Sequence, residues 1–162
     1  MPVMLIALAV AAADQAVKHV VVKSLVLGEV RPVIPGFFNL TNLRNPGAVW
    51  GLFPGQGVLL VVLSLASLGM LAVLHRRTTA APLVRAALGF MAGGILGNLV
   101  DRLAYGYVVD FFDFHAGGWH WPAFNLADAA ICSGIVFYLL ATRCAAPPKP
   151  GDAAGAADAG AG

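Results

Sequence analysis

Residues 57–74 read GVLLVVLSLASLGMLAVL, a run of apolar and small residues without a charged side chain. A helix needs about 20 largely apolar residues to cross a hydrocarbon core of about 30 Å. The whole chain of 162 residues shares this character, because 59% of its residues are hydrophobic, 11% are charged, and its mean hydropathy is +0.81. An average soluble domain carries about 25% charged residues. The composition therefore excludes an ordinary soluble globule and predicts a membrane protein.

Three further stretches around this run are long and apolar enough to span a bilayer, at residues 2–22, 83–103 and 124–142. No Lys or Arg precedes the first of them, so we expect it to remain as a span rather than to be cleaved as a signal peptide. The chain is thus predicted to be an all-α integral membrane protein, with four transmembrane helices in a single domain at 1–144. Residues 145–162 are rich in Ala, Gly and Pro, and we expect them to form a disordered tail.

Basic residues set the predicted orientation of these spans. Arg76, Arg77 and Arg85 lie in or next to the short connection between the second and third spans, which the positive-inside rule places in the cytoplasm. Both termini are then cytoplasmic, and the two longer connections face outward. In the first of these, residues 23–56 mix apolar residues with Gly, Pro, Asn and Arg, which predicts short strands and turns that lie on the membrane surface or over a groove. The net charge of +2 contains no basic run, so we expect no nucleic-acid partner.

Acidic residues are expensive inside a membrane unless they are paired, so each one in or beside a span is a candidate for function. The predicted orientation brings four of them toward the outer end of the bundle. These four are Asp14, Asp101, Asp110 and Asp128.

Each of these acids also has a purely structural interpretation. Asp14 and Lys18 are spaced as an i, i+4 ion pair, and Asp101 is spaced to hold Arg102. Asn125 with Asp128 fits an ordinary helix N-cap followed by an acid three residues later. A solvated turn is the default for Asp110 and for Asp113. The residues alone leave these alternatives open.

The side chains that are missing limit the possible chemistry. The chain has no Gly-x-Ser-x-Gly motif, and its four Ser have no evident His or Lys partner, so a serine hydrolase is disfavoured. Asp110, Asp113, His115 and His120 carry ligand-type side chains, but their spacing fits no metal motif, and we expect no metal and no cofactor. Two neighbouring aspartates could share one proton, so that one activates water and the other protonates a leaving amine.

Four motifs then occur in order along the spans: TNLRNPGAVWG at 41–51, GGILGNLVDR at 93–102, YVVDF at 107–111 and FNLAD at 124–128. Together they resemble the lipoprotein signal peptidases, the bacterial signal peptidase II family. The resemblance implies a multi-pass aspartic endopeptidase of the bacterial cytoplasmic (inner) membrane, with its active site near the periplasmic face. Its substrates would be prolipoproteins, cut just before a cysteine that carries diacylglycerol. Residues 29–53 would form a small extracytoplasmic β-like cradle between helices 1 and 2, over the substrate groove.

Carried over by motif, the resemblance implies that Asp110 and Asp128 are the catalytic residues. It also implies a set of substrate-binding or supporting residues. These are Asp14, Lys18, Asn45, Gly94, Asn98, Asp101, Arg102, Asn125 and Ala127.

The sequence also leads to expectations about partners, oligomeric state and an alternative function. Besides prolipoproteins we expect only membrane lipids as partners, and a monomer, because no stripe of small residues stands out as a dimer face. The alternative function is a small membrane transporter or proton carrier that binds a cation at Asp14 and Asp101. Such a protein would drive uptake into vesicles and would not cleave peptides.

Overall fold

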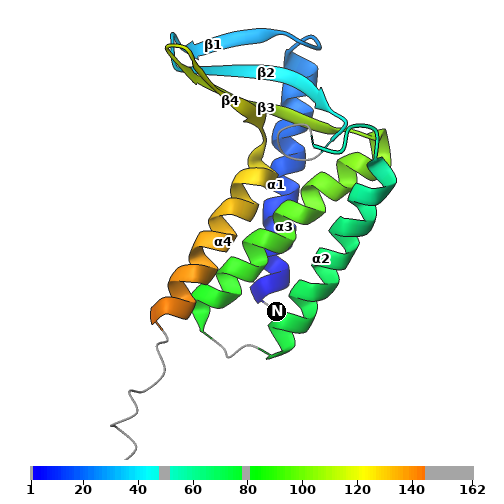
Figure 1. The fold of residues 1–162 in the computed structure, drawn as a ribbon, viewed down its shortest axis with the longest axis vertical. Coiled ribbons are helices and arrows are strands. Elements are labelled where there is room, and N and C mark those ends of the chain that lie inside the picture. The colour runs from blue at the N-terminus through cyan, green and yellow to red at the C-terminus, as the bar shows by residue number, and fades with distance from the viewer. Residues whose placement is uncertain (1, 48–51, 78–80, 145–162) are drawn as a thin grey trace, which may run out of the picture.

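The computed structural model describes residues 2–47, 52–77 and 81–144. The expected tail and residues 48–51 of the first motif lie outside this range. The described part contains four helices that are each long and apolar enough to cross a membrane (Figure 1), which confirms the four predicted spans. They are α1 (Pro2–Ser24), α2 (Gly57–Arg77), α3 (Pro82–Tyr105) and α4 (Leu126–Cys144).

The helix ends follow local chemistry. Pro82 occupies the first turn of α3, where its missing N–H costs nothing, and Gly106 ends the same helix with φ +78°. The backbone N–H of Gly106 bonds the Arg102 carbonyl, which closes the last turn. The α4 helix begins after Asn125, two residues later than the sequence predicts, because Asn125 caps it.

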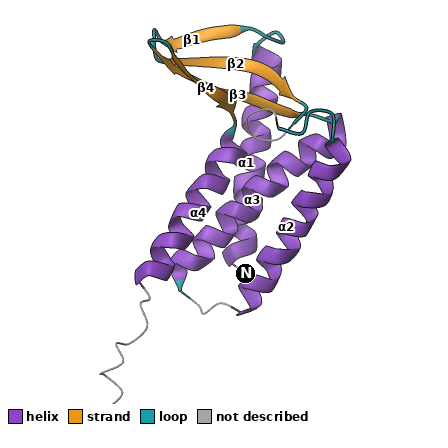
Figure 2. Ribbon diagram, viewed as in Figure 1, coloured by secondary structure: helices purple, strands orange, loops and turns teal. Residues whose placement is uncertain are grey.

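A four-stranded antiparallel sheet lies across the end of the bundle away from the N-terminus (Figure 2). The strand order is β1-β2-β3-β4, so the two hairpins pair through the central strands β2 and β3. The edge strands β1 and β4 each contain a proline, the residue that interrupts a strand ladder least at an edge. The strands are β1 (Val30–Ile34), β2 (Phe38–Asn45), β3 (Val108–Ala116) and β4 (Trp119–Phe124).

The sheet corrects the expected architecture. Strands are present within residues 29–53, as predicted, but half of the sheet comes from the connection between α3 and α4. A cradle formed between helices 1 and 2 alone is therefore not confirmed, and Asp110 and Asp113 lie on a strand rather than in a solvated turn. The β3–β4 hairpin turns at Gly117, which has φ +59°. Such a backbone conformation favours glycine.

Helix α3 lies centrally and packs against each of the other three helices. Its glycines allow close approach: an added Cβ would lie 2.7 Å from Ile6 at Gly89, 2.6 Å from Val10 at Gly93 and 2.7 Å from the Asp14 carboxylate at Gly97. This is a stripe of small residues at every fourth position, which the sequence analysis missed. The stripe is covered by α1 of the same chain, so it is not a free dimer face.

One hydrophobic cluster fixes the sheet on the bundle. Phe111 of β3 is fully buried and packs with Val21 and Leu25 near the end of α1. Leu126, at the start of α4, packs against the same cluster. This contact holds the start of β3 beside the first turn of α4, where the candidate residues lie.

Candidate active site

A cavity of about 510 Å³ opens between α2, α3, α4 and the sheet. Both predicted catalytic residues, Asp110 and Asp128, line this cavity, and Arg102 also lines it. Most of its remaining wall is apolar. The lining residues are Asn45, Leu60, Leu63, Ser64, Ser67, Ile95, Asn98, Arg102, Val108, Asp110, Trp121, Pro122, Ala123, Phe124, Asp128, Ala129, Ile131 and Cys132.

The Asp110 carboxylate is buried and held by two amides. Oδ2 accepts a hydrogen bond from Asn45 Nδ2 at 2.9 Å, and Oδ1 accepts one from Asn125 Nδ2 at 2.7 Å. Burial raises the pKa of Asp110 to about 7, and the nearby charge of Asp128 acts in the same direction. The hydrogen bond from Asn45 opposes this rise because it favours the ionised form. Asp110 is thus suited to hold a proton near neutral pH.

Asp128 lies in the first turn of α4 and is half-buried. Its backbone N–H donates to Asn125 Oδ1 at 2.9 Å, while its Oδ2 accepts from the Asn125 backbone N–H at 3.2 Å, the reciprocal pattern of a capping box. Its Oδ1 accepts from Asn98 Nδ2 at 2.8 Å. The structural and functional interpretations of Asp128 are therefore compatible, because the capping carboxylate also faces the cavity.

Asn125 connects the two carboxylates. It is fully buried, its side-chain amide donates to Asp110, and its backbone N–H donates to Asp128. The same side-chain Nδ2 lies 3.1 Å from Asn98 Oδ1. A single residue thus brings both aspartates to one wall of the cavity.

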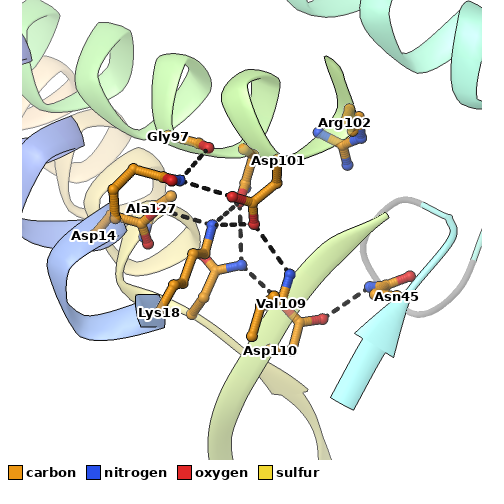
Figure 3. Close-up of polar contacts among 12 residues, drawn as sticks. Asp14, Lys18, Asn45, Gly97, Asp101, Arg102, Val109, Asp110 and Ala127 are labelled. Atoms are coloured by element: carbon orange, nitrogen blue, oxygen red, sulfur yellow. Dashed lines mark hydrogen bonds and ion pairs between the residues drawn. The ribbon is translucent and has the colours of Figure 1, made fainter. Parts of the chain in front are cut away.

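A second polar group lies behind this wall, centred on Lys18 of α1 (Figure 3). The Lys18 ammonium lies 2.8 Å from Asp14 Oδ2, 2.9 Å from Asp101 Oδ2 and 3.0 Å from Asn98 Oδ1. We call Lys18, Asp14, Asp101 and Asn98 the Lys18 cluster; all four are buried. The expected i, i+4 pair of Asp14 and Lys18 is present, and it belongs to this larger network.

The Lys18 cluster reaches the two segments that carry the catalytic candidates. Asp14 Oδ1 accepts from the backbone N–H of Ala127 at 2.9 Å, and Asp101 Oδ2 accepts from that of Val109 at 3.1 Å. Asp101 therefore pairs with Lys18 rather than holding its neighbour Arg102. Arg102 instead donates to the Gly47 carbonyl at 3.2 Å, and Figure 3 shows its side chain lying apart from Lys18.

One feature of the site concerns the packing of α3 on α4, and one polar residue of the site was not predicted. Gly94 faces Ala127, so that an added Cβ at Gly94 would overlap the Ala127 carbonyl oxygen. Gln15 was not predicted, although its Nε2 donates to Asp101 Oδ1 at 2.7 Å and to the Gly97 carbonyl at 3.0 Å. Its position three residues before Lys18, on the same helix face, was the available signal.

Of the four side chains considered as possible metal ligands, the structure separates Asp110 from Asp113, His115 and His120. Asp113 accepts from Asn39 Nδ2 at 2.8 Å and pairs with His120 Nε2 at 2.5 Å, beside His115 in a different pocket from Asp110. Within residues 2–47, 52–77 and 81–144, no group of three His, Cys, Asp or Glu side chains could hold a metal ion.

Fold and site together define a class: a polytopic membrane protein with two aspartates facing one mostly apolar cavity at the end of a four-helix bundle. Comparison with known proteins narrows this class. The family model described as Signal peptidase (SPase) II matches residues 6–144, and the chain belongs to this family.

Individual relatives agree with the family assignment. A lipoprotein signal peptidase of Desulforapulum autotrophicum is 43% identical over 141 residues, which cover 83% of this chain and 87% of that protein. A lipoprotein signal peptidase of Moorella thermoacetica is 44% identical over 137 residues, which cover 84% of this chain and 89% of that protein. A solved structure, titled a bacterial membrane enzyme by the in meso method at 2.3 Å resolution, superposes with a TM-score of 0.81 at 31% identity, covering 86% of each chain.

Proposed function

We propose that this protein is an aspartic endopeptidase that removes signal peptides from diacylglyceryl-modified prolipoproteins, with Asp110 and Asp128 as its catalytic residues. The observation that carries the proposal is that both carboxylates line one cavity and are joined through Asn125. The names of its relatives, lipoprotein signal peptidases, support the substrate class. Family membership gives no support to a transporter that uses Asp14 and Asp101.

The proposed reaction needs one ionised and one protonated carboxylate. The ionised one takes a proton from water, whose oxygen attacks the scissile carbonyl carbon and forms a tetrahedral intermediate. The protonated one then gives its proton to the amide nitrogen as the C–N bond breaks, and the pair ends with one proton, as it began. Arg102, in the same wall, provides donors for a substrate carbonyl oxygen.

The cavity wall fits the proposed substrate. Leu60, Leu63 and Ile95 give it a largely apolar surface on the side of the spans, suited to a signal helix or a diacylglyceryl chain. The peptide bond next to the modified cysteine would then reach the carboxylates at the end of the bundle. In this arrangement the sheet serves as a cradle over the groove.

The basic residues support an orientation for this enzyme. Arg76 and Arg77 close α2, and Arg85 lies in the first turn of α3, at the end of the bundle away from the sheet. We therefore place this end in the cytoplasm, with both termini, and the carboxylates near the periplasmic face of the inner membrane. We propose a monomer as the working unit, because all the groups named in the reaction come from one chain.

The proposed activity is tested with purified protein in detergent and a diacylglyceryl-modified prolipoprotein. Mass spectrometry of the products should show cleavage immediately before the lipid-bearing cysteine. The same precursor without the lipid, and with its cysteine changed to Ala, should be cut far more slowly. Cleavage elsewhere, or no cleavage of the lipid-modified precursor, would refute the proposal, and loss of activity in EDTA with rescue by a divalent ion would argue against a reaction by carboxylates alone.

We expect cleavage to weaken at alkaline pH. Because the pKa of Asp110 is raised to about 7, this group is mostly protonated below that pH and loses its proton above it. Once both carboxylates are ionised, none can protonate the leaving amine, so kcat/KM should fall about tenfold per pH unit above the pKa. A pH profile between about pH 5 and pH 9 measures this, and an unchanged rate from neutral to alkaline pH would contradict it.

A further inference from the structure

The ammonium group of Lys18 has an unusual environment for a charge within a membrane span. Its side chain is 4% exposed, and three acceptors lie around Nζ at 2.8, 2.9 and 3.0 Å, from Asp14, Asp101 and Asn98. The two carboxylate oxygens form ion pairs with the ammonium, and Asn98 Oδ1 accepts a hydrogen bond from it. Lys18 does not line the cavity that Asp110 and Asp128 face.

The first branch from Lys18 leads to Asp128. Lys18 can only donate, so the atom of Asn98 that faces it must be the acceptor Oδ1. The Asn98 amide is thereby fixed in one of its two orientations, with Nδ2 directed at Asp128 Oδ1 at 2.8 Å. Asn125 Nδ2 also donates to this Oδ1, at 3.1 Å, so Lys18 and Asn125 together favour the orientation in which Asn98 donates to Asp128.

The second branch leads to Asp110. Asp101 Oδ2, which faces Lys18, also accepts from the backbone N–H of Val109, the residue before Asp110 (Figure 3). Gln15 holds the other oxygen of Asp101. The start of β3 is thus attached to α3 through a carboxylate whose position depends on Lys18.

We propose that Lys18 is a positioning residue, which directs the carboxylates of both Asp110 and Asp128 at the substrate through Asp101 and Asn98. This inference rests on the proposed function. An ion pair that only neutralised Asp14 would need no contact with Asn98, and buried ion pairs are in general weak evidence for stability. The two branches instead end at the two groups that must be aligned within about 0.5 Å for catalysis.

The test is the variant Lys18→Met, which keeps an unbranched side chain and removes the donors. We expect kcat for prolipoprotein cleavage to fall about 10- to 100-fold with KM within about twofold, since misplacement by about 1 Å can lower rates about 100-fold. The decline of kcat/KM at alkaline pH should also move to higher pH in this variant, because the charge of Lys18 lowers the pKa of Asp110. Lys23→Met, which removes an exposed lysine from the last turn of the same helix, is the control and should behave like the unaltered protein.

A second variant separates positioning from folding. Lys18→Met leaves Asp14 and Asp101 buried without a positive partner, so the single variant is expected to be less stable. Lys18→Met combined with Asp14→Asn restores the net charge of the group, and Asn can still accept from Ala127. If Lys18 positions the carboxylates, this double variant regains thermal stability while kcat stays low. Recovery of kcat together with stability, or an unchanged kcat and pH profile in Lys18→Met, would overturn the inference, whereas failure of the unaltered protein to cleave would refute the proposed function itself.

Discussion

Asp128→Asn and Asp110→Asn are each expected to lower kcat for prolipoprotein cleavage by at least about 1,000-fold, within the range that general acid–base groups contribute. Asparagine keeps the size of the side chain and one acceptor, so the bonds to Asn98, Asn125 and Asn45 can in part remain. What it loses is the ability to take up or release a proton. Single-turnover cleavage, measured with thermal unfolding of each variant, separates the lost chemistry from lost folding.

The matched control for these variants is Asp113→Asn. Asp113 lies on the same strand as Asp110 and is also buried, but it pairs with His120 in the separate pocket. We expect it to change kcat little. The double variant of Asp110 and Asp128 should be no slower than the worse single one, because residues that act as a unit are not additive. Full activity in either single variant, or an equal loss in Asp113→Asn, would remove the basis for the proposed pair.

The helical half of the fold could be predicted because lipid imposes a simple rule on sequence. A span must be apolar over its whole length, so the run at 57–74 and its three companions stand out without knowledge of their neighbours. The same rule makes the few intramembrane charges conspicuous. Asp14 and Lys18 could be assigned to one pair from spacing alone, but Asp101, the second carboxylate that pairs with Lys18, is supplied by another helix, which no local pattern reveals.

The sheet was only half predicted for a related reason. Residues 30–45 mix strand formers with turn residues, a local signal, whereas β3 carries aspartates within an aromatic run. From sequence alone, an aspartate within an aromatic run indicates a turn, unless the fold places its carboxylate in a cavity. Asp110 faces a cavity that forms only when β3 meets α4, so its position on a strand depends on tertiary structure.

Gly94→Ala is expected to be the most harmful single-methyl change in this part of the bundle. The added Cβ would overlap the Ala127 carbonyl oxygen and lie 2.7 Å from Cγ1 of Ile131. A carbonyl in a helix cannot rotate away as a flexible side chain can, so the first turn of α4 must move. We expect the free energy of unfolding to fall by about 1–3 kcal/mol, as for other overpacked cores.

The same displacement should lower activity, because the turn that must move carries Asp128, and the backbone N–H of Ala127 in that turn donates to Asp14 Oδ1. We expect kcat to fall at least about tenfold, since small misplacements at a reacting centre are costly. Gly69→Ala on α2 is the matched control: it adds the same methyl to a helical glycine, but nothing lies within 4 Å of the new Cβ. That variant should keep full activity and equal or slightly higher thermal stability, because alanine favours the helix. If the two variants prove equally stable and equally active in detergent, close packing of α3 on α4 does not hold the catalytic carboxylate in place.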